Sequence, residues 1–189
     1  CPMSVDMAKM KIEVQAARVA AHGLSLRDRL IGHLPRYAPW AAQLRGLLNL
    51  RNRVPLLARL GEWVTGFAAD RPLPEWRAPF RAPADDPEPQ VLLLADTFNA
   101  HFEPGILGDA LAVLRAAGLR VGVAGAPKGR ALCCGRTYLS AGMVDEARAE
   151  MARTVAAIRP VIERGGAVVG LEPSCLLTFR DEAPRLLPD

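Results

Sequence analysis

Hydrophobic residues follow two different patterns along the chain, on either side of a proline-rich stretch. In the first third, apolar residues recur every three or four positions, which is the spacing of amphipathic helices. After residue 90, short continuous apolar runs alternate with helical patterns. This change of period predicts a helical N-terminal part followed by an α/β part.

The first helix is predicted over residues 4–22. Ser4 or Asp6 can cap its N-terminus, and Gly23 suits the position just after its C-terminus. Three shorter helices are predicted further along: one that Ser25 caps and that ends before Pro35, one at about 39–50 and one at about 55–66.

Residues 70–89 contain six prolines, which lack the backbone N–H that helix interiors and central strands require. We therefore interpret this stretch as an extended linker. The predicted organisation is a helical arm over 1–69, the linker over 70–89 and an α/β domain over 90–189.

Three short apolar runs, 91–95, 119–124 and 167–171, are typical of strands buried on both faces of a parallel sheet. Helical patterns at 106–117 and 144–164 separate them, the second interrupted or bent near Pro160. The predicted fold class is therefore α/β: a short parallel sheet of about three strands with flanking helices, preceded by an all-helical basic arm and a proline-rich linker.

The positive charge of the chain is concentrated in one segment. Residues 24–66 hold seven arginines against two acidic residues, whereas residues 91–189 hold eleven basic and eleven acidic groups. A charge excess confined to one helical segment indicates local docking, either packing on a partner domain or contact with an anionic membrane surface. Without interleaved aromatic residues or a helix-turn-helix pattern, it does not indicate nucleic-acid binding.

Chemistry is expected at the carboxyl ends of the strands, where open α/β sheets bind ligands. Asp96 and Thr97 follow the first strand, Cys133 and Cys134 follow the second, and Glu172 and Cys175 follow the third. Segments distant in sequence should thus meet at one edge of the sheet and bring the cysteines together.

Each cysteine also has a simpler interpretation, as a small buried hydrophobic residue. Adjacent residues point in different directions, so Cys133 and Cys134 are harder to explain in this way. Gly135 would permit close approach of a bulky ligand, and Arg136 or the N-terminus of the following helix would lower the thiol pKa.

The segments CCGRTYLSAGMVDEAR, which begins at Cys133, and EPSCLLTFRDE, which contains Cys175, resemble the cysteine-rich CCG domain. This domain occurs in heterodisulfide reductase-type proteins, in the iron–sulfur subunits of glycolate and glycerol-3-phosphate dehydrogenases, and in bacterial FAD-linked oxidases. Cys1-Pro2 resembles the end of a ferredoxin-type cysteine motif, which lies upstream in that family. The chain is then expected to begin within a longer protein, and residues 90–189 to be the first of two tandem CCG repeats.

The resemblance implies an electron-transfer segment of a FAD-linked 2-hydroxyacid dehydrogenase acting on a substrate such as D-lactate or glycolate. FAD would be bound elsewhere in the parent protein, and electrons would pass through iron–sulfur clusters toward quinone or another carrier. Cys1 would ligate a ferredoxin-type 4Fe-4S cluster, and Cys133, Cys134 and Cys175 would bind a cluster, a metal or an electron acceptor. The cysteine usage indicates a reducing compartment and hence a cytoplasmic location, with peripheral contact at the inner face of the membrane as the alternative that the arginine-rich helices suggest. The chain is not expected to be catalytically complete alone.

Two positions depart from the family pattern: Thr97 and Glu172 stand where the family usually has cysteines. A four-ligand cluster would therefore need Glu172, Asp96 or an outside ligand. The alternatives are a cluster-free docking domain and a zinc or dithiol site. His101 is interpreted as a polar loop residue, with a ligand or proton-relay role as its alternative, and Gly125–Gly129 as a turn, because it lacks the spacing of a phosphate-binding loop.

Overall fold

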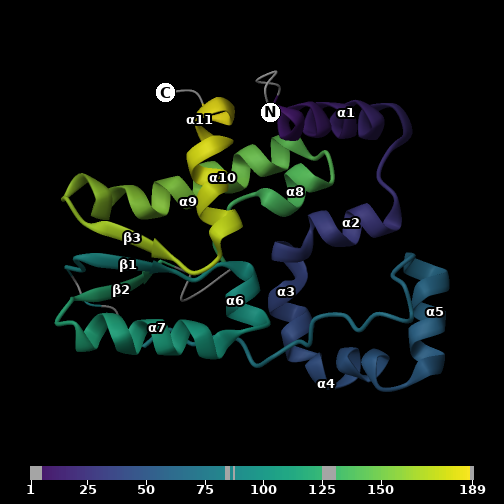
Figure 1. Ribbon diagram of the computed structural model, residues 1–189, viewed down its shortest axis with the longest axis horizontal. Helices are drawn as coiled ribbons and strands as arrows, with labels where there is room; N and C mark the ends of the chain where they lie inside the picture. The colour runs from purple at the N-terminus through teal and green to yellow at the C-terminus, as the bar shows by residue number, and fades with distance from the viewer. Residues whose placement is uncertain (1–5, 84–85, 87, 125–130, 188–189) are drawn as a thin grey trace.

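The computed structural model describes residues 6–83, 86, 88–124 and 131–187. It confirms the predicted α/β class: N-terminal helices are followed by a three-stranded parallel sheet with flanking helices (Figure 1). Gly125–Gly129 and Cys1 lie outside the described residues.

The sheet contains strands β1 (Val91–Leu94), β2 (Val121–Ala124) and β3 (Ala167–Gly170) in the order β2-β1-β3. Both neighbours pair with β1 in parallel, Val91 lying opposite Val121 on one side and Ala167 on the other. Since β1 is central, all four of its residues are buried, which explains its uninterrupted apolar sequence.

A helix covers each face of the sheet: α7 (Pro104–Ala116) lies on one face and α9 (Val144–Glu163) on the other (Figure 1). Side chains of a strand alternate between faces, so Leu93 packs in the core on the α7 side while its neighbours Leu92 and Leu94 pack on the α9 side. Helix α9 continues through Pro160, where an interruption or bend was predicted.

Four short helices follow the carboxyl ends of the strands or complete the chain. They are α6 (Thr97–His101), α8 (Arg136–Ser140), α10 (Pro173–Asp181) and α11 (Ala183–Leu186). The first three are the next helices along the chain after β1, β2 and β3, respectively. The candidate site residues lie just before these three helices or in their first turns.

The N-terminal helices begin with α1 (Met7–His22) and α2 (Leu26–Gly32), and the predicted caps Asp6 and Ser25 accept hydrogen bonds from backbone N–H groups of their first turns. In place of the single helix predicted at about 39–50, the structure has three short helices. The first of them starts earlier than predicted, at Leu34, and accepts Pro35 in its first turn. These three helices and the last helix of the arm are α3 (Leu34–Gln43), α4 (Arg45–Leu48), the 3₁₀ helix η1 (Asn49–Asn52) and α5 (Pro55–Thr65).

The N-terminal helices pack against α8, the helix that follows the paired cysteines. The Thr137 hydroxyl donates to the carbonyl of Gly32 at 3.2 Å, and the rings of His33 and Tyr138 meet edge to face at 5.8 Å. Gly142 has φ +77°, and a Cβ at this position would lie 2.6 Å from the carbonyl oxygen of Gln15 in α1. The arm thus supports the segment that carries the site.

The proline-rich stretch is held in place by side chains of η1. Asn49 bonds both the N–H and the carbonyl of Trp76, and Asn52 bonds those of Leu73 in the same way. Among the described residues between 66 and 90 there is no helix or strand, as the prolines predicted. The stretch is also held against α6, because the N–H groups of Arg77 and Phe80 donate to the carbonyls of His101 and Ala100.

Candidate redox site at the carboxyl edge of the sheet

The structure brings two of the predicted cysteines into contact. Cys134 lies just before α8 and Cys175 lies in the first turn of α10, yet the Cys134 thiol donates to the Cys175 sulfur with a distance of 3.1 Å between the Sγ atoms. Both side chains are almost fully buried. Two segments 41 residues apart in sequence therefore form one buried thiol pair.

Cys133 completes the group of thiols and is held through its backbone and its side chain. Its carbonyl accepts a hydrogen bond of 2.8 Å from the Thr154 hydroxyl in α9, and its sulfur accepts one of 3.3 Å from the N–H of Gly135. Its thiol also interacts with that of Cys134. Thr154 is fully buried, so this contact fixes the cysteine segment against α9.

Gly135 is required for a reason other than the predicted approach of a ligand. Its φ is +81°, in the left-handed region, and a Cβ would lie 2.8 Å from the carbonyl oxygen of Ala147 in α9. What comes close to Gly135 is therefore the backbone of α9. The glycine lets the chain turn sharply into α8 directly after the two cysteines.

The surroundings of Cys133 and Cys134 raise their thiol pKa values, whereas a lowered pKa was predicted. Cys133 lowers the pKa of Cys134, but the hydrogen bond to Cys175 and burial outweigh this and raise that pKa to about 12. The hydrogen bond with Cys134, followed by burial, raises the pKa of Cys133 well above its ordinary value. The backbone N–H of Arg136, at the start of α8, lowers the pKa of Cys134 but does not offset the other causes, and the guanidinium of Arg136 pairs with Glu182 at 2.7 Å.

The residues proposed as auxiliary ligands act as helix caps. Asp96 accepts hydrogen bonds from the N–H groups of Phe98 and Asn99 and from the Asn99 side-chain amide. Glu172 accepts from both the N–H and the hydroxyl of Ser174 at the start of α10. Each carboxylate is therefore already satisfied by its own helix.

Thr97, which stands where the family usually has a cysteine, is 1% exposed, and its hydroxyl oxygen has no hydrogen-bond partner among the described residues. His101 is buried on α6, not in a loop as predicted, and its Nδ1 lies 2.9 Å from the carbonyl oxygen of Thr97. Burial lowers the pKa of His101, which keeps the ring neutral. A buried polar group therefore lies at the carboxyl end of the central strand.

A charged pair beside Cys133 was not found by sequence reasoning. Glu150 is 2% exposed, accepts from Arg153 at 2.8 Å, and raises the pKa of Cys133 further through its negative charge. Arg153 also donates to the carbonyl of Ala131, just before the cysteines. One signal could have indicated this pair: Glu150 lies next to Met151 on the apolar face of α9, where an acidic residue is unexpected unless it is paired.

The described residues do not present an assembled metal site. No group of three or more histidine, cysteine or acidic side chains among them is placed to hold a metal ion. The candidate thiol donors at the sheet edge are Cys133, Cys134 and Cys175, and the sulfurs of Cys134 and Cys175 are in direct contact. In this conformation the residues do not fit a cluster with four ligands.

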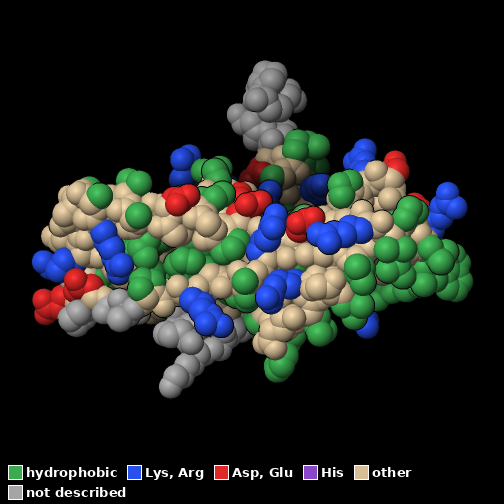
Figure 2. Space-filling model, turned by 90° about the horizontal axis from the view of Figure 1, so that it is seen from below, with side chains coloured by type: hydrophobic (Ala, Val, Ile, Leu, Met, Phe, Trp, Pro, Cys, Tyr) green, Lys and Arg blue, Asp and Glu red, His purple; other side chains and the backbone are tan. Residues whose placement is uncertain are grey.

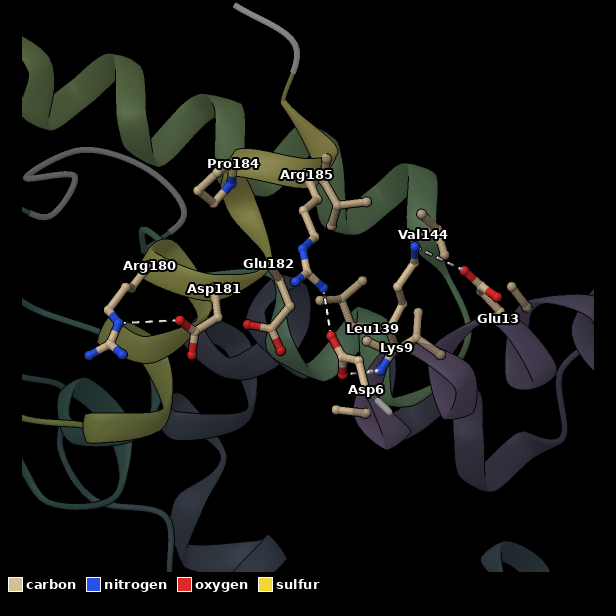
Figure 3. A pocket seen from close by; sticks show the side chains of 14 residues that line it. Asp6, Lys9, Glu13, Leu139, Val144, Arg180, Asp181, Glu182, Pro184 and Arg185 are labelled. Atoms are coloured by element: carbon tan, nitrogen blue, oxygen red, sulfur yellow. Dashed lines mark hydrogen bonds and ion pairs between the residues drawn. The ribbon is translucent and has the colours of Figure 1, made fainter. Parts of the chain in front are cut away.

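A separate cleft of about 900 Å³ lies between α1 and the C-terminal helices α10 and α11. Figure 3 shows Arg185 reaching from α11 to Asp6 at the start of α1, with a hydrogen bond of 2.6 Å. This hydrogen bond lowers the pKa of Asp6. Cys133, Cys134 and Cys175 are not among the described residues that line the cleft, so it is distinct from the thiol site.

The end of the molecule formed by α4, η1 and α5 is an exposed apolar surface, which we call the helical platform (Figure 2). Trp63 is 84% exposed and Leu56 is 74% exposed, while Ala58 is the buried residue of α5. The apolar side chains of the platform that are more than a third exposed are Leu47, Leu48, Leu50, Val54, Leu56, Leu57, Leu60, Trp63 and Val64.

Comparison with protein-family models, with curated proteins and with solved structures found no match to this chain. Within the part of the chain that the structure describes, no helix is both long enough and apolar enough to cross a membrane.

Proposed function

We propose that this chain is the electron-transfer segment of a larger FAD-linked 2-hydroxyacid dehydrogenase, and that Cys133, Cys134 and Cys175 form its redox site. The observation that supports this proposal is the 3.1 Å contact between the sulfurs of Cys134 and Cys175, with the Cys133 thiol beside them. Free buried cysteines that merely fill a core need not meet across distant segments. Thiols in contact can take up and release electrons together.

In this proposal, the flavin domain of the same polypeptide or complex oxidises a substrate such as D-lactate or glycolate and passes electrons to this segment. The segment passes them toward quinone or another carrier. Cys1 would belong to a ferredoxin-type cluster whose other ligands lie elsewhere. The three thiols do not fit a four-ligand cluster in the described conformation. At this site, electrons would therefore be taken up by the thiols themselves and not by a cluster.

The test uses the complete protein, with its flavin, prepared without oxygen. Replacing Cys134 or Cys175 by serine should leave flavin reduction by substrate unchanged and slow reduction of a quinone analogue at least about tenfold, or about 1.4 kcal/mol in barrier. The matched control is Ser174→Ala, which alters the neighbour of Cys175 without removing a thiol. Unchanged quinone reduction in both cysteine variants would refute the proposal.

Iron and zinc counting after anaerobic reconstitution adds a second readout. If the protein binds metal and the Cys133→Ser/Cys134→Ser double variant does not, the metal is held by these thiols and rearranges them. Metal binding would then displace the protons that keep the thiols neutral. Without bound metal, electron transfer that still depends on Cys134 and Cys175 supports the thiol pair alone.

A docking role is the second candidate, and the helical platform favours it. A monomer rarely leaves so many large apolar side chains exposed in one place, and such a surface usually meets a partner. Arg53 and Arg59 are also exposed there, which suits an acidic rim on the flavin domain or an anionic membrane surface.

Replacing Leu56, Leu60 and Trp63 by serine should change the free energy of unfolding by less than about 0.5 kcal/mol per substitution, because these side chains are already exposed. The same variant should lose association with the flavin domain and with vesicles of phosphatidylglycerol and phosphatidylcholine. Urea unfolding and co-sedimentation measure the two effects. Ala58→Asp, on the buried side of α5, is the control that should destabilise the fold, and undiminished association of the serine variant would exclude the platform as a docking surface.

A further inference from the structure

The contact between Cys134 and Cys175 is close to the geometry of a covalent bond. Their sulfurs are 3.1 Å apart, whereas a disulfide bond is about 2.05 Å long. The difference is about 1 Å, which small rotations of the two side chains can supply. Both sulfurs are already buried, so the bond would form without exposing new apolar surface to water.

We infer that Cys134 and Cys175 form a reversible dithiol–disulfide pair that exchanges electrons two at a time, while Cys133 remains a free thiol. This inference deepens the proposed redox function and rests on it. It assigns the site a class of reaction partner, namely thiols and disulfides of low molecular weight.

The selection of Cys175 over Cys133 as the partner of Cys134 follows from the backbone. A disulfide between adjacent residues must distort the peptide that joins them, and this costs free energy. The segment is also held: Thr154 bonds the carbonyl of Cys133, and the N–H of Gly135 bonds its sulfur. The thiol of Cys134 donates to Cys175, which is therefore the nearer partner on an independent segment.

The exchange balances in atoms and electrons. A thiolate of the pair attacks one sulfur of an external disulfide, forms a mixed disulfide and releases one external thiol. The second thiolate of the pair attacks the protein sulfur of that mixed disulfide and releases the other external thiol. In sum, two protein thiols are oxidised to one disulfide, the external disulfide is reduced to two thiols, and the two protons pass to these products.

The environment makes this pair slow to react and selective. Because the thiolate is the attacking form, a thiol pKa near 12 leaves little of it at neutral pH. Burial further restricts access by the external disulfide. The pair should therefore react slowly with dissolved disulfides and resist accidental oxidation by them.

The experiment incubates the Cys1→Ser chain in buffers of reduced and oxidised glutathione, traps the remaining thiols with an alkylating reagent and maps the peptides. Oxidation should lower the thiol count by two and link the tryptic peptide 131–136 to the peptide 165–180. Reduced glutathione should restore both thiols. No link between these peptides at any buffer ratio would overturn the inference.

Serine variants identify the bonded residues. The link should form in Cys133→Ser and be lost in Cys134→Ser, because the sulfur in contact with Cys175 belongs to Cys134. In concentrated urea, Cys133 and Cys134 should link to Cys175 about equally, since the fold no longer selects between neighbours. A link that persists in Cys134→Ser, or a preference that survives in urea, would contradict the geometric argument.

The two proposals fail separately. If the disulfide does not form but quinone reduction still requires Cys134 and Cys175, the redox function stands and dithiol exchange is refuted. If the disulfide forms but quinone reduction is unchanged in the cysteine variants, the pair is a thiol–disulfide site outside the electron path, and the proposed function is refuted.

Discussion

Replacing Gly135 by alanine is expected to lower the free energy of unfolding by about 2–4 kcal/mol. The residue has φ +81°, where a side chain is strained, and its new methyl group would lie 2.8 Å from the carbonyl oxygen of Ala147. Either α8 moves away from α9 or the turn after the cysteines changes. Urea unfolding measures the loss.

Gly118→Ala is the matched control for this substitution. Gly118 has nearly the same φ, +80°, but nothing lies within 4 Å of the position of its Cβ. Replacing it should cost only the strain of a side chain at positive φ, without a steric clash. The loss in free energy of unfolding should be about 1 kcal/mol, because the lower entropy of the unfolded alanine chain offsets part of the strain. Equal losses for the two variants would mean that close packing against α9 is not what requires glycine at position 135.

Replacing Arg153 by leucine is expected to cost about 3 kcal/mol, because it removes the 2.8 Å ion pair with the buried carboxylate of Glu150. The same change removes the hydrogen bond to the carbonyl of Ala131, next to the cysteine segment. We therefore also expect the oxidation of the Cys134–Cys175 pair to become less selective. Thermal or urea unfolding gives the first effect, and peptide mapping gives the second.

Two further variants separate charge burial from general damage to α9. Arg148→Leu removes a guanidinium from an exposed pair on the same helix and should cost less than about 1 kcal/mol. Glu150→Gln combined with Arg153→Leu removes both charges of this ion pair and should recover most of the lost stability. If the double variant is as unstable as Arg153→Leu alone, the buried carboxylate is not the cause.

The fold was predictable because its signals are local. The β1 run of four apolar residues can be buried on both faces only in a sheet that helices cover on both sides, and Asp6 and Ser25 cap helices as their sequence positions predicted. The helix boundaries around Pro35 were less accurate. A proline is accepted in the first turn of a helix as readily as it ends one, and only packing distinguishes the two cases.

The site was predictable in position but not in electrostatics. Topology alone places Cys134 and Cys175 at one edge of the sheet, and there they meet. The expected activation by Arg136 depended on where a flexible side chain turns, and this is decided by Glu182, 46 residues away. Likewise, nothing in the sequence near Gly135 indicates that the backbone of Ala147 fills the space beside it.

The roles of the carboxylates at the sheet edge could not be predicted from the sequence either. A short polar residue after a strand can be a ligand or a helix cap, and the sequence of Asp96 fits both roles. The structure assigns it to the cap of α6, where three hydrogen bonds satisfy it. The unpartnered hydroxyl of Thr97 beside it is a feature of packing that no sequence pattern indicates.

A crystal structure of the reduced protein, grown without oxygen, tests most directly whether the cysteine segments meet as described. The sulfurs of Cys134 and Cys175 should lie in contact, near the 3.1 Å found here, with the Cys133 thiol beside them. Sulfur atoms that are separated by aliphatic side chains, each enclosed alone, would contradict the proposed redox site and the dithiol–disulfide exchange.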